Sequence, residues 1–266
     1  MGSGIRVTVD NMNLEQIAES GQCFRWKKIE NDKYVIPGLR LENRDLEDIT
    51  IIQKGNCFEV SCNENDWNSH WTNYFDLDTD YGQIGRNILA SSDKHAIEAF
   101  NCGSGIRILR QDVWEMIVTF LISQNNNIKR ITNSVEAICS RNNGHFPKPG
   151  EIDSDIFMDK TLGLGYRSPY LKEIYDFAET NPDWVSELKN LNYDQAMESL
   201  KERNGIGPKV ANCICLFGLH HVDAFPIDTH IKQLLAKYYP YGFNFDYYKG
   251  YAGIVQQYLF YYELMH

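Results

Sequence analysis

The order of hydrophobic and polar positions divides the chain into two stretches with different periodicity. Between residues 24 and 62, short runs rich in β-branched and aromatic residues are separated by turn-forming clusters such as Lys54-Gly55-Asn56. This pattern is typical of hairpins in an antiparallel sheet. It predicts strands over residues 24–29, 34–37, 49–53 and 57–62.

From Ile84 onward, apolar residues recur at helical spacing. The acidic and aromatic segment 66–80 before this stretch is expected to be a connection. Helices are predicted over residues 83–90, 94–101, 111–123, 127–141, 153–159, 169–180, 183–190, 193–203, 208–219, 229–238 and 246–263. The expected fold class is therefore α+β. An antiparallel β domain with flanking helices would occupy residues 1–95, and a larger all-α domain residues 96–266.

Composition narrows the classes of function. Hydrophobic residues make up 43% of the 266 positions, enough for a packed core. No apolar run reaches the roughly 18 residues of a membrane span, so no membrane partner is expected. The seven cysteines contain no Cys-x-x-Cys pair, which argues against a zinc ribbon and favours reduced thiols.

The net charge is −10, with −6 on residues 1–95 and −4 on residues 96–266. Affinity for duplex DNA comes largely from neutralisation of phosphates, so the charge argues against a broad basic DNA-binding surface. Any such surface must be local and rely on helix N-termini and a few cations. We therefore expect DNA binding to weaken steeply with salt, with a modest number of phosphate contacts.

The segment Arg203-Asn204-Gly205-Ile206-Gly207-Pro208-Lys209 contains a Gly-x-Gly turn that leads directly into a helix. Two glycines let the backbone adopt positive φ and approach another chain closely. The first amides of the following helix have no intrahelical partner, so the turn is suited to bind a phosphate. An ordinary helix–turn–helix corner would use the same residues, and Gly-x-Gly alone does not decide between the two.

Lys209 stands in the first turn of that helix, where the macrodipole disfavours a cation. Most lysines in such positions are simply exposed. An amine nucleophile, however, must be uncharged, although a free lysine has a pKa of about 10.4. A helix N-terminus and partial burial both favour the neutral form. Lys209 is therefore a candidate nucleophile, with Cys213 four positions later on the same helix face.

The segment Phe225-Pro226-Ile227-Asp228-Thr229-His230 opens another helix, and its Asp228 lies nineteen residues after Lys209. Asp228 is in position to cap that helix. A capping carboxylate stays ionised, and an ionised carboxylate can stabilise an oxocarbenium-like sugar cation. His230 lies in the first turn and could donate a hydrogen bond to a phosphate, although a surface histidine is the commoner case.

Together these segments resemble the helix-hairpin-helix and Gly/Pro-Asp loop of the DNA glycosylase superfamily. Four further segments, Glu19–Trp26, Ser123–Thr132, Leu162–Arg167 and Tyr251–Phe260, extend the resemblance to the 8-oxoguanine DNA glycosylase family, in that family's order. The resemblance implies an N-terminal antiparallel β-sheet domain of the TATA-binding-protein type (TBP-like), followed by an all-α helix-hairpin-helix domain. It also implies a bifunctional enzyme that excises 8-oxoguanine opposite cytosine and nicks the abasic site.

The resemblance assigns four residues to the lesion base. The Gly21 carbonyl would accept a hydrogen bond from N7–H, which 8-oxoguanine has and guanine lacks. Phe260 and Cys213 would contact the two faces of the extruded base, and Gln256 its Watson–Crick edge. Without the resemblance, the commoner interpretation is that Phe260 is a core residue and Gln256 a surface residue.

Further residues are assigned to DNA and to the base opposite the lesion. Asn125, Arg130 and Arg167 would contact the unpaired cytosine, and Tyr166 would fill the gap in the base stack. Gly205, Gly207 and His230 would bind the DNA backbone. The asparagine segment is equally typical of a loop with capping side chains.

In the implied mechanism, Lys209 attacks C1′, Asp228 stabilises the sugar cation, and a Schiff base leads to β-elimination. No redox cofactor or catalytic metal is expected. The sequence does not decide whether the hairpin carbonyls bind a structural cation. The expected partner is duplex DNA containing 8-oxoguanine, bound by a monomer. The enzyme would be cytoplasmic and nucleoid-associated in a bacterium, or nuclear in a eukaryote.

Three other functions are open at this point. A glycosylase for alkylated bases would use Asp228 and water, a mechanism that gives Lys209 no role. A non-catalytic DNA-binding protein would use the hairpin alone. A structural protein that binds no nucleic acid would agree best with the net charge of −10.

Overall fold

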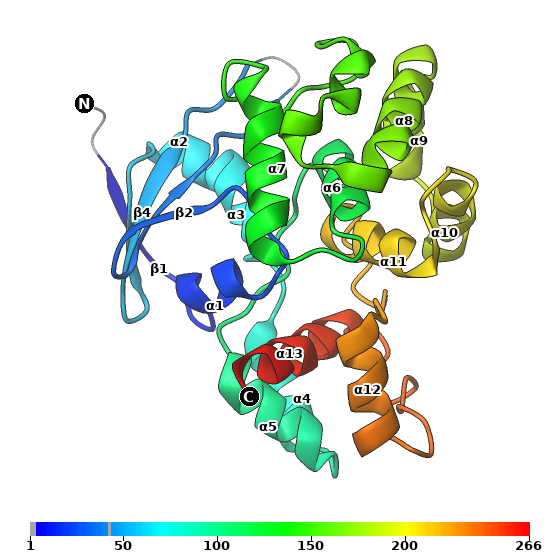
Figure 1. Cartoon of the computed structure of the whole chain (residues 1–266). Coiled ribbons are helices and arrows are strands. Elements are labelled where there is room, and N and C mark those ends of the chain that lie inside the picture. The colour runs from blue at the N-terminus through cyan, green and yellow to red at the C-terminus, as the bar shows by residue number, and fades with distance from the viewer. Residues whose placement is uncertain (1–3, 42–43) are drawn as a thin grey trace. The chain divides into compact units, whose positions relative to one another are not determined.

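The structure is a computed structural model that describes residues 4–41 and 44–266. Its packing divides the chain into two compact units, Met1–Arg110 with Thr229–His266, and Gln111–Asp228. The first unit therefore contains both ends of the chain, blue to green and orange to red in Figure 1. The boundary predicted at residue 95 does not coincide with this division. The reason is that α5 (Lys94–Gly103) packs against α13 (Ala252–Met265), which no local periodicity reveals.

The first unit contains a five-stranded antiparallel sheet in the order β1-β5-β4-β3-β2. Its strands are β1 (Ile5–Thr8), β2 (Lys27–Glu30), β3 (Lys33–Ile36), β4 (Ile49–Lys54) and β5 (Cys57–Val60). The antiparallel hairpins predicted over residues 24–62 are confirmed, although β2 begins later than predicted. The sequence analysis did not predict β1, whose Ile5 pairs with Val60.

The segment 66–80, predicted as a connection, is helical as far as Tyr74, and for this part the prediction is wrong. It forms α2 (Glu64–Asp66), a π-helical turn η1 (Trp67–Trp71) and α3 (Thr72–Tyr74). The buried aromatics Trp67, Trp71, Tyr74 and Phe75 belong to the same core as Ile51 and Phe58 of the sheet. Their spacing of four, seven and eight residues is that of one helix face, so the signal was present in the sequence. The short helix α1 (Leu14–Glu19), also not predicted, buries Leu14 and Ile17 in this core.

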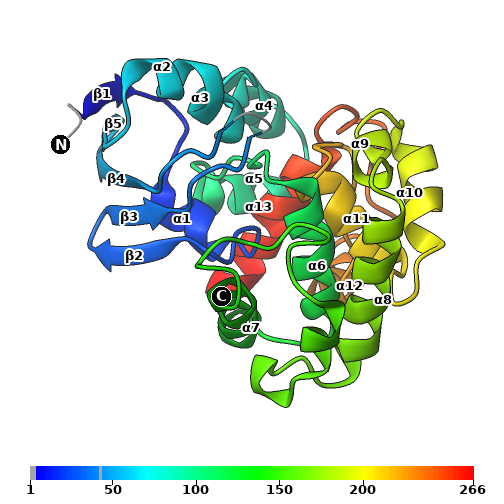
Figure 2. The same ribbon diagram turned by 90° about the horizontal axis from the view of Figure 1, so that it is seen from above.

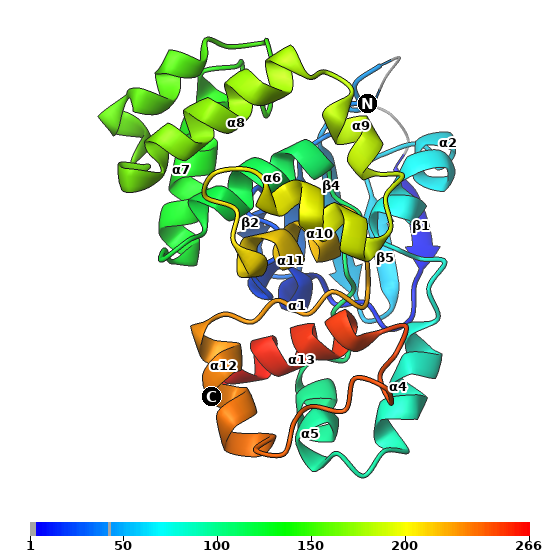
Figure 3. The same ribbon diagram turned by 90° about the vertical axis from the view of Figure 1, so that its right-hand side faces the viewer.

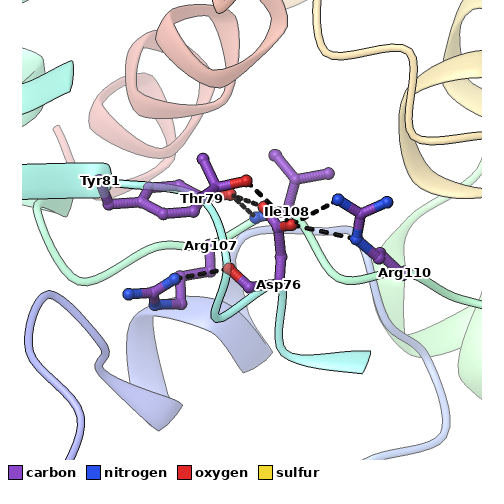
Figure 4. Close-up of polar contacts among 6 residues, drawn as sticks. All are labelled: Asp76, Thr79, Tyr81, Arg107, Ile108 and Arg110. Atoms are coloured by element: carbon purple, nitrogen blue, oxygen red, sulfur yellow. Dashed lines mark hydrogen bonds and ion pairs between the residues drawn. The ribbon is translucent and has the colours of Figure 1, made fainter. Parts of the chain in front are cut away.

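A buried ionic network anchors the backbone at residues 107–110 (Figure 4). The side chain of Asp76 is fully buried and accepts hydrogen bonds from Tyr81, at 3.0 Å, and from Arg110, at 2.8 and 3.0 Å. Burial raises the pKa of Tyr81 well above its usual range, so its hydroxyl keeps the proton that it donates. Arg107 donates to the carbonyl of Asp76 at 2.8 Å.

Asp76→Ala should lower the free energy of unfolding by about 3 kcal/mol, because it leaves buried Tyr81 and partly exposed Arg110 without their acceptor. The measurement is chemical denaturation followed by tryptophan fluorescence. Glu59→Ala is the control, because it breaks surface ion pairs with Arg6 and Lys54. Equal midpoints for the two variants would contradict the importance of the buried network.

The remaining helices of the first unit are α4 (Tyr81–Leu89), α5, α12 (Thr229–Tyr238) and α13. Figure 3 shows α13 beside α12, with α5 and α4 next to it. The last helix begins at Ala252 and not at the predicted residue 246. Gly250 adopts a φ of +92°, in the left-handed region, and this interrupts the helical pattern just before it.

The second unit is helical throughout its regular elements. They are α6 (Val113–Ile122), α7 (Ile128–Ser140), three 3₁₀ turns η2 (Ser154–Met158), η3 (Lys160–Leu162) and η4 (Gly165–Arg167), and then α8 (Ser168–Thr180), α9 (Trp184–Leu188), α10 (Tyr193–Lys201) and α11 (Pro208–Phe217). Apolar α6 packs against α7, α8 and α11 (Figure 2). Across the described parts of both units, no helix is long and apolar enough to cross a bilayer.

Candidate functional site

The hairpin between α10 and α11 has the geometry that its two glycines predict. Gly205 adopts a φ of +81°, and a Cβ there would lie only 2.7 Å from Cγ of Tyr170. A side chain is therefore excluded at Gly205 by both backbone conformation and space. Gly207 is exposed, forms the N-cap of α11, and has open space where a Cβ would be.

The start of α11, like that of α8, differs from the starts of α7 and α10. Asn127 caps α7 and Asn192 caps α10, each by accepting a hydrogen bond from a backbone amide. Among the described residues, no side chain provides such a cap for α11. Its first amides therefore remain accessible to an anion from solution, as the predicted phosphate contact requires.

The structure brings Lys209, Cys213 and Asp228 to one place in the second unit. Lys209 is half-buried, with its Nζ 5.7 Å from the ring centre of Phe120 on α6. Cys213 is only 3% exposed, and burial raises the pKa of its thiol. The charge and hydrogen bond of Lys209 act in the opposite direction, while the carboxylate of Asp228 adds to the increase. The thiol thus lies near both residues predicted to be catalytic.

A residue that the sequence analysis missed holds the Asp228 segment beside α11. The side-chain oxygen of Asn212 accepts hydrogen bonds from the backbone N–H of Phe225, at 3.1 Å, and from Tyr193, at 2.8 Å. Its Nδ2 donates to the carbonyl of Pro208 at 2.9 Å. One amide therefore links the first turn of α11, α10 and the segment that ends at Asp228. Its position next to Cys213 was the only sequence signal.

Each residue of the asparagine segment after α6 has a local structural role. Asn125 adopts a φ of +44°, and its Nδ2 lies 3.2 Å from the hydroxyl of Tyr166. Asn126 donates to the carbonyl of Ile122, and Asn127 caps α7. The loop with capping side chains is thus confirmed, and it is compatible with a DNA contact by exposed Asn125.

Arg167 has a different environment from the one expected of a residue that contacts cytosine. It is 4% exposed and donates hydrogen bonds to the carbonyls of Gln124, Asn125 and Leu164. Its guanidinium lies 4.5 Å from the ring centre of Tyr166, which is itself 53% exposed. In this structure Arg167 therefore holds the loop that presents Asn125 and Tyr166. Arg130 is exposed in the first turn of α7.

Four other candidates lie in the first unit. Gly21 has a φ of +75°, and a Cβ there would lie 3.2 Å from Cε1 of Phe260, although 239 positions separate the two in sequence. Gln256 is buried one turn before Phe260 on α13. The ring of exposed His230 lies 6.4 Å from that of Phe260, edge to face. The structure thus groups Gly21, Phe260 and His230.

Burial should make Cys213 far less reactive than exposed Cys57 toward iodoacetamide near neutral pH. Its raised pKa leaves less of the reactive thiolate at any given pH, and the reagent also lacks access. We expect the rate to be lower by roughly tenfold or more, measured by peptide mass spectrometry over time. In denaturant the two rates should converge. Comparable rates in the folded protein would contradict the buried position.

Comparisons with known proteins agree with this geometry. Residues 4–117 match the family described as 8-oxoguanine DNA glycosylase, N-terminal domain. The N-glycosylase/DNA lyase of Saccharomyces cerevisiae is 30% identical over 272 residues, which cover 88% of this chain and 70% of the yeast protein. The chain belongs to the 8-oxoguanine DNA glycosylase family.

Solved structures of 8-oxoguanine DNA glycosylases share the whole fold of this family member. MBOgg1 in complex with a low-affinity DNA ligand superposes with a TM-score of 0.89 and 31% identity, covering 100% of this chain and 96% of that one. The Clostridium acetobutylicum 8-oxoguanine glycosylase/lyase, bound to duplex DNA with cytosine opposite 8-oxoguanine, gives a TM-score of 0.88 at 29% identity with the same coverage. The α+β fold expected from the sequence is thereby confirmed.

Proposed function

We propose that the chain excises 8-oxoguanine from duplex DNA through a lysine Schiff base, with cytosine as the preferred opposite base. Membership of the 8-oxoguanine DNA glycosylase family supports the bifunctional glycosylase and lyase activity. The grouping of Lys209, Cys213 and Asp228 is the observation on which the catalytic assignment rests. We also propose that the enzyme acts as a monomer and without a redox cofactor or catalytic metal.

The proposed first step is displacement of the base. The uncharged amine of Lys209 forms a bond to C1′ as the N-glycosidic bond breaks, and the electron pair of that bond leaves with the base, which takes up a proton. Positive charge develops on the sugar, and the Asp228 carboxylate stabilises it. Without a partner anion, this charge would be costly in a site screened from water.

The second step cleaves the strand. Ring opening converts the C1′ adduct into a protonated Schiff base, which makes the C2′ proton acidic. Loss of that proton forms the C2′–C3′ double bond and expels the 3′ phosphate, so the backbone is nicked 3′ to the lesion. Water then releases Lys209. In this scheme one residue performs both reactions, which accounts for a bifunctional enzyme with a single nucleophile.

The proposed DNA contacts follow from exposure and local geometry. The uncapped start of α11 would bind a phosphate through backbone amides, as would His230 at the start of α12. Exposed Tyr166 would fill the gap left by the extruded base, while Asn125 and Arg130 would contact the opposite cytosine. Such contacts do not require a basic protein, which reconciles DNA binding with a net charge of −10.

Single-turnover excision of 8-oxoguanine opposite each of the four bases tests the proposal. We expect the fastest release opposite cytosine, because a site built for that base leaves polar groups unpaired with any other. Equal rates opposite all four bases would refute the preference for cytosine. Release of alkylated bases without release of 8-oxoguanine would refute the proposed substrate.

A further inference from the structure

Three buried polar side chains surround the turn that contains Gly21. Ser20, Gln22 and Gln257 are at most 1% exposed, whereas the residues around a turn are usually solvated. Burying an amide is costly unless its donors and acceptors are paired. The hydrogen bonds of these side chains therefore show which backbone groups they hold in place.

Gln257 on α13 holds the peptide before Gly21. Its Nε2 donates a hydrogen bond to the carbonyl of Ser20, across 237 positions of sequence. Gln256, the preceding residue, belongs to the proposed lesion-binding group. Two adjacent residues of α13 thus have different roles. Gln256 is proposed to bind the lesion, whereas Gln257 bonds the Gly21 turn to the helix that also carries Phe260.

Gln22 holds the backbone after Gly21. Its Nε2 donates to the carbonyl of Arg107 and to the hydroxyl of Ser20, both at 2.9 Å, and its Oε1 accepts from the amide of Leu109, also at 2.9 Å. The side chain thus bonds to residues 107 and 109 as a neighbouring strand would. That stretch is itself fixed by the ionic network of Asp76 in Figure 4.

We propose that Gln22 and Gln257 are positioning residues that hold the Gly21 carbonyl where it distinguishes 8-oxoguanine from guanine. The two bases differ at N7 by a single proton, so selectivity depends on where one oxygen lies. A glycine with positive φ provides no side chain to fix that oxygen, and its neighbours must do so. This proposal rests on the proposed function, because it presumes that the Gly21 carbonyl meets the lesion.

The test measures affinities in a Lys209→Gln background, which separates binding from turnover. Dissociation constants are determined for duplexes that contain either 8-oxoguanine or guanine opposite cytosine. Adding Gln257→Met or Gln22→Met should reduce the ratio of the two constants by roughly tenfold to a hundredfold, the effect of a misplacement of about 1 Å. The loss should fall on the 8-oxoguanine duplex.

Gln53→Met is the matched control. Gln53 also bonds to backbone groups of the first unit, at Leu14 and Met12, but it does not contact the Gly21 turn. It should leave the ratio within about twofold, well short of the roughly tenfold change expected of the other two variants. Equal ratios for all three methionine variants, or equal losses on both duplexes, would overturn the proposal. If the parent Lys209→Gln protein itself shows no preference for 8-oxoguanine, the proposed function fails instead.

Gln257→Glu provides a second variant of nearly unchanged shape. A protonated glutamic acid can donate to the Ser20 carbonyl, whereas a carboxylate would repel it. Burial raises a carboxyl pKa, so selectivity should recover as the pH falls from about 8 to about 5.5. If the side chain at position 257 only filled space, the ratio of the two dissociation constants would not recover as the pH falls. A ratio that stays constant with pH would therefore overturn the role assigned to Gln257.

Discussion

Lys209→Gln is expected to abolish both base excision and cleavage of an abasic site, with a loss on the order of 10³-fold or more in each rate. Glutamine has nearly the length of lysine but no nucleophilic amine, so no Schiff base can form. Affinity for a duplex containing 8-oxoguanine should change little. Single-turnover kinetics and borohydride trapping measure the two losses directly.

Lys201→Gln is the matched control for this experiment. Lys201 is exposed at the end of α10, in the same hairpin, and its replacement removes the same charge. It should retain excision and the covalent complex that borohydride traps. If Lys209→Gln still gives a trapped complex, another amine is the nucleophile. If it lowers only affinity, the lysine serves DNA binding alone.

Asp228→Asn should slow excision of 8-oxoguanine by about 10²- to 10³-fold, the usual cost of removing one electrostatic contact to a transition state. Cleavage of a preformed abasic site should fall much less, because no base has to leave in that reaction. The comparison of the two substrates with one variant therefore isolates the step that Asp228 serves. Rates are measured at saturating enzyme.

Asp194→Asn removes a carboxylate from the first turn of α10 and should leave both rates unchanged. This control matters because the net charge of −10 makes every lost carboxylate favourable for DNA affinity. An equal fall in both reactions for Asp228→Asn would assign the residue to general positioning. No fall in either would exclude it from catalysis.

The sequence contained enough information to predict the elements that depend on local signals. The hairpin glycines, the alternating strands and most helices of the second unit have such signals, and the structure confirms them. Strand β1 has four residues and no flanking pattern of its own, so only its pairing with β5 reveals it. The helical part of residues 66–80 was mispredicted for a different reason. The helical spacing of its aromatic residues is a local signal, but the acidic composition of the segment masked it.

Side-chain environments were less predictable than elements. Arg167 was assigned to cytosine by resemblance, yet in the structure its donors bond the carbonyls of the loop after α6. Asn212 gave no sequence signal beyond its position next to Cys213, although it links α11 to the Asp228 segment. Both roles depend on contacts between residues far apart in the chain, which neither periodicity nor spacing encodes.

The division of the chain has a consequence for biosynthesis. Residues 111–228 form a continuous unit, whereas the first unit lacks α12 and α13 until these helices have left the ribosome. We therefore expect the middle of the nascent protein to acquire stable structure first. Until α13 arrives, the apolar surface of α5 stays uncovered, and a chaperone that recognises such surfaces should bind stalled chains that end before residue 252.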